Sequence, residues 1–162
     1  MITTNHSPAE LEQKFWTHLA RDMIVMIGLP GKAAGRPMTA QLRGDRNSGP
    51  IWFFTAKDTD LGDGITSSTK AEMVFVSKGF DLFATVHGTI EVETDRAVLD
   101  DLWNGSVAAW FEGGKDDPKL QLLRLDPSEA EIWLNASSVI AGTKMMLGIG
   151  DRKEDYKATR RL

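Results

Sequence analysis

An arginine and a threonine stand in apolar surroundings where they could bind an anion. Arg36 opens a predicted strand, Arg36–Arg43, and shares its parity with apolar side chains, so it lies at the mouth of an apolar face. Thr55 closes another predicted strand. A guanidinium favours a bidentate anion such as a phosphate, and a threonine hydroxyl adds one neutral hydrogen bond. The alternative is an arginine paired with a surface carboxylate and a threonine that only fits its strand. Spacing alone favours that alternative, because most exposed arginines do no more.

Other side chains give weaker patterns for catalysis or metal binding. The three histidines lie on different predicted elements without the short spacing of metal ligands, so no metal site is expected. The aspartates of Asp58–Asp63 resemble a calcium loop, but Thr69 stands where a bidentate glutamate is needed. Ser106 lacks the second glycine of a nucleophile elbow, and Gly148–Gly150 lacks the third glycine of a dinucleotide-binding turn. The catalytic residues are therefore unknown from the sequence.

Composition excludes several further kinds of chemistry. The 162-residue chain has no cysteine, which rules out disulfides, thiolate metal sites and a cysteine nucleophile. A net charge of −4 without a basic stripe argues against nucleic-acid binding. No secretory signal is visible, and the longest apolar stretch, around Met23–Leu29, is too short to cross a bilayer. We therefore expect a cytoplasmic protein with no membrane partner.

The elements that must position these residues begin with a helix. Ser7–Glu10 forms a capping box with proline at the first helical position, and apolar residues recur at helical spacing to about Ala20. Ile51–Thr55 is predicted as a strand that is too apolar on both faces to have a solvated side. A short capped helix is expected around Gly64–Ser68. Further strands are predicted at Met23–Leu29, Arg36–Arg43, Met73–Val76 and Leu82–Val92.

The last third of the chain contains two short predicted helices and a hairpin. Thr94 or Asp95 caps the first helix, and the second carries Trp110 and Phe111. The predicted hairpin joins strands Leu120–Leu125 and Ala130–Leu134 through a turn at Asp126–Ser128, because aspartate, proline and serine together are typical of turns.

These elements predict a fold that is mainly β with short helices (β+α). Six to seven mostly antiparallel strands, several of them apolar on both sides, are expected to close into a small barrel, since closure removes exposed sheet edges. Without an internal repeat or linker, residues 1–150 are expected to form a single domain. The charged residues 151–162 are expected to form a C-terminal tail that is either mobile or docked on a partner subunit.

Three motifs and the order of elements between them resemble a known family. The motifs are GRPMTAQ (Gly35–Gln41), IWFFTAKD (Ile51–Asp58) and LWNGSVAAWFEGGKDDPKLQLLRLDPSEAEIW (Leu102–Trp133). The chain resembles the flavin-binding split-barrel superfamily typified by pyridoxamine 5'-phosphate oxidase, and within it the bacterial general stress protein subfamily. The resemblance runs from the first helix to about Trp133.

The resemblance implies an FMN-binding split β-barrel and a homodimer with two FMN sites in grooves between the subunits; FMN is favoured over FAD. Arg36 would bind the flavin phosphate. Thr39 and Gln41 would lie beside ribityl or ring atoms, and Phe54 and Thr55 would follow the ring edge and phosphate. Backbone amides of the strand would be directed at the polar edge of the flavin.

Three further residues are candidates for the groove wall at the dimer interface: Trp110, Phe111 and Lys115. Packing in the core or interface explains tryptophan there equally well. The chain departs from the oxidase in two places, with Gln41 in place of a lysine and Asp58–Leu61 in place of a serine-arginine-lysine cluster. Unless Lys57 or Lys70 compensates, flavin binding should be weaker by about 1 kcal/mol for each like-charge neighbour.

The resemblance implies a flavin-dependent oxidoreductase that moves two electrons between a nicotinamide or similar donor and a small acceptor, with the cofactor carrying the chemistry. No histidine follows His87, so the substrate residues of the true oxidase are missing and pyridoxamine phosphate oxidation is not expected. Two alternatives stay open. One is a flavin-binding or flavin-buffering dimer without turnover, and the other is a flavinless interaction protein on the same scaffold.

Overall fold

The computed structural model, which describes residues 6–136, 139–146 and 159–161, begins with helix α1 over Pro8–Arg21. The hydroxyl of Ser7 accepts from the backbone N–H of Glu10 at 3.2 Å, and the Glu10 carboxylate accepts from the N–H of Ser7 at 3.0 Å. The capping box predicted from the sequence is therefore confirmed. One face of α1 is buried and packs onto the strands.

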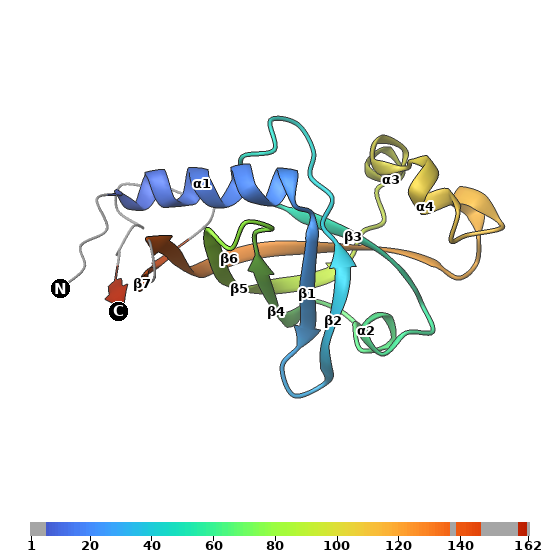
Figure 1. Cartoon of the computed structure of the whole chain (residues 1–162). Helices are drawn as coiled ribbons and strands as arrows, with labels where there is room; N and C mark the ends of the chain where they lie inside the picture. The colour runs from blue at the N-terminus through green and yellow to red at the C-terminus, as the bar shows by residue number, and fades with distance from the viewer. Residues whose placement is uncertain (1–5, 137–138, 147–158, 162) are drawn as a thin grey trace.

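The strands form one antiparallel sheet that curls into a nearly closed barrel (Figure 1). They are β1 (Ile24–Leu29), β2 (Ala33–Thr39), β3 (Ile51–Ala56), β4 (Thr69–Val76), β5 (Leu82–Val92), β6 (Leu120–Ala136), β7 (Val139–Met146) and β8 (Thr159–Arg161). The barrel strands follow the order β2-β1-β4-β5-β6-β3, and β7 and β8 continue the sheet from β6. The expected antiparallel barrel with short helices is confirmed.

The short helices lie at the opposite end of the barrel from α1 or beside β2 (Figure 1). They are α2 (Asp60–Asp63), α3 (Arg96–Leu102), α4 (Gly105–Ala108) and the 3-10 helix η1 (Gly114–Asp116). The predicted helix around Gly64–Ser68 is wrong in position: α2 begins earlier, because the Thr59 side chain accepts from the N–H of Gly62 and caps the helix there.

The predicted hairpin at Asp126–Ser128 is wrong, because β6 runs unbroken from Leu120 to Ala136. Its first part pairs with β3 up to Leu125, and its second part pairs with β7 from Glu129 onward. Pro127 lies between these two partners, opposite an irregularity in the pairing with β5 at His87 and Gly88. A proline is tolerated at such a bulge because the missing N–H is not required for a regular ladder there.

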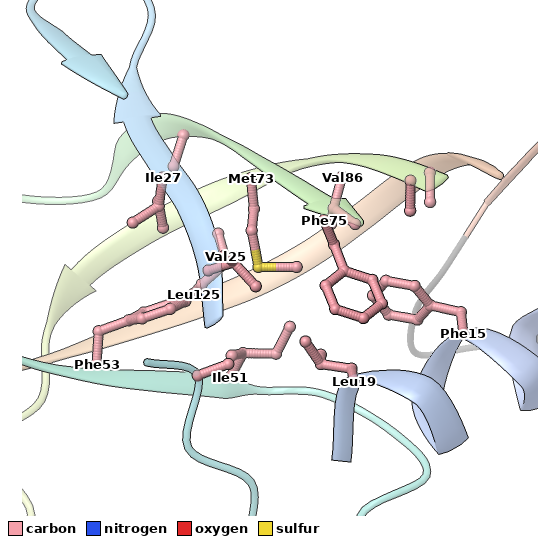
Figure 2. Packing of buried hydrophobic residues seen from close by; sticks show 14 of the residues in the cluster. Phe15, Leu19, Val25, Ile27, Ile51, Phe53, Met73, Phe75, Val86 and Leu125 are labelled. Atoms are coloured by element: carbon pink, nitrogen blue, oxygen red, sulfur yellow. The ribbon is translucent and has the colours of Figure 1, made fainter. Parts of the chain in front are cut away.

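The core fills the space between the barrel strands and α1. Phe15 and Leu19 of α1 point toward Phe75 of β4 and Ile51 of β3 (Figure 2). The rings of Phe15 and Phe75 meet edge to face with centroids 6.2 Å apart. β3 is buried on both faces for most of its length, as its sequence predicts.

Much of the expected C-terminal tail, residues 151–158 and 162, lies outside the described residues. Thr159–Arg161 form β8, which pairs antiparallel with Gly142–Lys144 of β7. In the part of the chain that the structure describes, no helix is long and apolar enough to span a membrane.

Candidate functional site

The barrel closes between β2 and β3 through a single bridge. Gln41 and Trp52 exchange two backbone hydrogen bonds, of 2.8 and 2.9 Å, just beyond the end of β2. Within the residues that the structure describes, the two strands do not pair beyond this bridge: β2 pairs with β1, and β3 pairs with β6. The barrel is therefore split along one side.

A cavity of about 470 Å³ opens at this split, within the usual size range of small-molecule sites. Side chains of β2, β3, the turn before α2 and the α4 region line it. The lining residues are Arg36, Pro37, Met38, Thr39, Gln41, Phe54, Thr55, Ala56, Thr59, Asn104, Ser106, Val107, Trp110 and Phe111.

Backbone groups also face the split. Alternate residues of a strand direct their N–H and C=O groups to the same edge. Gln41 and Trp52 bond to each other across the split. The backbone groups of Thr39 and Phe54, two residues away along each strand, therefore point into the split. The N–H of Ala40 points the other way and donates to Met23 O at 2.7 Å. A planar ligand with donors and acceptors along its edge would satisfy both walls.

Arg36 supplies the positive charge of the cavity. It pairs with Ile27 of β1 through the backbone register, and its half-buried side chain lines the cavity. Within the described residues the guanidinium makes no hydrogen bond or ion pair. The lining that the described residues form contains no carboxylate, so an anion placed here meets the Arg36 cation and no like charge from these residues.

Thr55 and Thr59 form the polar floor beside α2. Thr55 is 5% exposed, and its hydroxyl oxygen lies 3.2 Å from that of Thr59. The Thr59 hydroxyl donates to Ala56 O at 2.9 Å and accepts from the N–H of Gly62 at 3.0 Å. Two backbone contacts therefore hold the Thr59 hydroxyl, and this hydroxyl in turn contacts that of Thr55.

Aromatic side chains form the apolar part of the cavity. Phe54 meets Trp103 edge to face at 6.0 Å between ring centroids. Val107 and Phe111 are buried and anchor α4, which Asn104 caps by accepting from the N–H of Val107 at 3.1 Å. Trp110 stands at the rim and is 84% exposed. A large exposed indole at a cavity mouth is typical of a surface that another molecule covers.

Seven of the nine residues that the sequence suggested for cofactor binding line this one cavity: Arg36, Thr39, Gln41, Phe54, Thr55, Trp110 and Phe111. The two lysines do not line it. Lys57 is exposed beyond the end of β3. Lys115 donates to the Asp100 carboxylate at 3.0 Å, and this bond lowers the pKa of Asp100. A lysine held in that ion pair is not directed at the cavity.

Sequence reasoning missed several lining residues, chiefly Thr59, Asn104 and Ser106. Asn104 and Ser106 both belong to the long motif. The sequence suggests Ser106 only as a nucleophile. An asparagine before a short helix is typical of a helix cap, and that signal could have identified Asn104. The acidic residues Asp58 and Asp60 are exposed and outside the cavity lining, so the expected repulsion of a phosphate does not come from the cavity wall.

The fold and this cavity define a class: an antiparallel split barrel with a cavity at the split. The chain belongs to the pyridoxamine 5'-phosphate oxidase like family, whose model matches residues 10–155.

Proteins similar to this chain are described as general stress proteins. A general stress family protein from Xanthomonas campestris pv. campestris is 53% identical, with a TM-score of 0.76 over 88% of this chain and 99% of that one. The general stress FMN/FAD binding protein from Xanthomonas citri is 52% identical, with a TM-score of 0.74 over 86% of this chain and 99% of that one. General stress protein 26 of Bacillus subtilis is 24% identical over 60% of this chain and 71% of its own length.

Proposed function

We propose that this chain binds a flavin nucleotide, FMN in preference to FAD, in the cavity at the barrel split. The observation that carries the proposal is that seven residues chosen from the sequence surround one cavity, and that one of them, Arg36, makes no hydrogen bond or ion pair within the described residues. A relative of 52% identity is described as FMN/FAD binding, which supports the same ligand.

The residues present fit a flavin nucleotide. Arg36 would hold the phosphate, and Thr39 and Gln41 would lie along the ribityl chain or the ring. The unpaired backbone groups of Thr39 and Phe54 would meet the polar edge of the ring, with aromatic side chains on its apolar parts. This assignment gives no role to Lys57 or Lys115, because neither lysine lines the cavity. The sequence had suggested Lys57 as a positive charge near the phosphate and Lys115 as part of the groove wall.

A bound flavin supplies two-electron redox chemistry at its ring, and we propose that the protein uses it as an oxidoreductase with a nicotinamide or similar donor. Among the described residues, the lining contains no histidine, carboxylate, lysine or tyrosine, so this part of the chain places no general acid or base on the cavity wall. That observation favours a second candidate function, flavin binding or buffering without turnover. Oxidation of pyridoxamine phosphate is not part of this proposal. The cytoplasmic location expected from the sequence stays a prediction.

We also propose a homodimer that covers the open side of the cavity. The exposed Trp110 at the rim supports it, because an indole buried against a second subunit would leave water and enclose the ligand. Sedimentation of the purified chain should give the mass of a dimer, and a monomer mass at every concentration would contradict this part of the proposal.

The first experiment is spectroscopic. The purified protein, or the protein mixed with FMN, should absorb near 450 nm, a general property of oxidised flavin, and NADH or NADPH should bleach that band. Colour without bleaching would favour binding without turnover. If FMN neither colours the protein nor quenches its tryptophan fluorescence, both flavin functions fail and the flavinless interaction protein is favoured.

The second experiment tests the phosphate site. Arg36→Ala should weaken FMN binding about tenfold to a hundredfold, because hydrogen bonds to a charged group contribute about 1.5–3 kcal/mol. Riboflavin, which lacks the phosphate, should bind Arg36→Ala as it binds the wild type. Arg21→Ala, on the exposed end of α1, is the matched control and should bind FMN normally. An unchanged FMN affinity in Arg36→Ala would place the phosphate elsewhere.

A further inference from the structure

The neighbours of two hydroxyl groups in the floor of the cavity determine which hydroxyl donates the hydrogen bond between them. Thr55 lies near the end of β3 and Thr59 caps α2, and their oxygens are 3.2 Å apart. Both residues line the cavity. A threonine hydroxyl has one proton and two accepting positions, so the neighbours of each oxygen decide which one donates.

The Thr59 hydroxyl donates its one proton to a backbone carbonyl. The hydroxyl lies 2.9 Å from the carbonyl oxygen of Ala56, which can only accept. The N–H of Gly62 donates to the same Thr59 oxygen at 3.0 Å. In the remaining contact, with Thr55, the Thr59 oxygen must therefore accept. Thr55 is the donor.

The turn that holds Thr59 is tightly packed, so this arrangement is not easily rearranged. A Cβ added to Gly62 would lie 2.6 Å from Ala56 O and 2.7 Å from Gln121 Oε1, closer than side chains approach. Only glycine allows its N–H to reach Thr59 at this position. Thr59 is thus fixed by one bond on each side.

We infer that Thr59 is a positioning residue that turns Thr55 into a hydrogen-bond acceptor toward the cavity, so the ligand group beside Thr55 is an O–H or N–H donor and not the phosphate. The inference rests on the proposed flavin site and refines it, since the sequence suggested Thr55 as a neutral donor to the phosphate. A phosphate oxygen there would have to draw the Thr55 proton away and leave two oxygens 3.2 Å apart with no proton between them. The phosphate then belongs at Arg36.

Two parts of a flavin nucleotide carry such donors, the hydroxyls of the ribityl chain and the imide N–H of the ring. The test is Thr55→Val in the full chain, which keeps the side-chain shape and leaves the bonds of Thr59 to Ala56 and Gly62 intact. Thr55→Ser, which keeps the hydroxyl, is the matched control. Affinity is measured by fluorescence titration with FMN, riboflavin and lumiflavin, which lacks the ribityl chain.

Thr55→Val should weaken FMN and riboflavin by the same factor, about twofold to tenfold, which is the effect of one neutral hydrogen bond. An equal loss with lumiflavin assigns the donor to the ring N–H, and an unchanged lumiflavin affinity assigns it to a ribityl hydroxyl. A loss confined to FMN would place the phosphate at Thr55 and overturn the inference. An unchanged affinity for FMN and riboflavin would overturn it as well.

Thr59→Val provides a second test, since it removes the acceptor that holds the Thr55 proton. Riboflavin binding should weaken, and Thr59→Ser should restore it. Tighter FMN binding in Thr59→Val would show that Thr55 prefers to donate to the phosphate, against the inference. If the wild type binds neither FMN nor riboflavin, the proposed function itself fails, an outcome that differs from failure of the Thr55 assignment in a protein that binds both.

Discussion

Asp22 shows how one side chain joins two distant parts of the fold. It follows α1 and is only 8% exposed. Its carboxylate accepts from the backbone N–H of Lys78 at 2.9 Å, in the turn between β4 and β5, and from Arg21 at 3.4 Å. The bond from the Lys78 N–H is the main cause that lowers the pKa of Asp22 below 3.8, while burial opposes it.

This lowered pKa predicts a dependence of stability on pH. The unfolded state binds the proton more readily than the folded state, so the stabilisation is present above about pH 3.8 and is lost as the pH falls through the lower folded pKa. Asp22→Asn should therefore be less stable than the wild type at pH 7, and the gap should narrow near pH 3. Urea unfolding at both pH values measures it. Asp45→Asn, in the exposed segment between β2 and β3, controls for the loss of one charge; an equal gap at both pH values would contradict the prediction.

At the same scale, the strand residues that the sequence suggested line the cavity, whereas the two lysines do not. Arg36, Thr39 and Gln41 were grouped by the family resemblance, because strand alternation alone puts Arg36 on the opposite face from Thr39 and Gln41. Neither Lys57 nor Lys115 lines the cavity. Lys115 pairs instead with Asp100, a contact of the tertiary structure that the sequence does not indicate. Thr59 was missed because its importance depends on Thr55, Ala56 and Gly62 meeting in one turn.

At the scale of elements, the close approach of β5 to β6 fixes the bulge. A Cβ on Gly88 would overlap the carbonyl oxygen of Asp126 and lie 3.0 Å from Pro127 Cα. Gly88→Ala should lower the free energy of unfolding by about 1–3 kcal/mol, because backbone atoms must move apart. Gly105→Ala, whose added Cβ meets nothing within 4 Å, is the matched control and should be neutral or slightly stabilising. Equal unfolding midpoints in denaturant for the two variants would contradict the prediction.

Elements with a complete local signal were predicted from the sequence, and elements that depend on distant partners were not. The capping box set the start of α1, and alternation set Leu82–Val92 of β5 at its observed bounds. The residues Asp126–Ser128 have turn chemistry, but they lie in β6 because that strand changes partner from β3 to β7 at this point. Such a change of partner leaves no mark on local propensity.

At the scale of the whole molecule, the buried face of α1 packs against the barrel strands, and Phe15 lies beside Phe75 in the core (Figure 2). Phe15→Ala should lower the free energy of unfolding by about 3–5 kcal/mol, because it leaves a cavity beside Phe75 and Trp16. Thr17→Ala, on the exposed face of the same helix, is the control and should change it by less than about 0.5 kcal/mol. Thermal or urea unfolding measures both, and a small effect of Phe15→Ala would show that the core collapses around the loss.

The pairing of β3 with β6 also has a consequence during synthesis of the chain. Ile51 of β3 pairs with Leu125 and Ala56 pairs with Leu120. More than a third of the chain must therefore be synthesised after β3 before this pairing can form. Until then, among the described residues, the backbone hydrogen bonds of β3 to an earlier residue are those between Trp52 and Gln41. An apolar strand left without its neighbour is prone to association with other chains. The nascent protein is therefore most vulnerable to aggregation between translation of Ile51 and emergence of Leu125 from the ribosome.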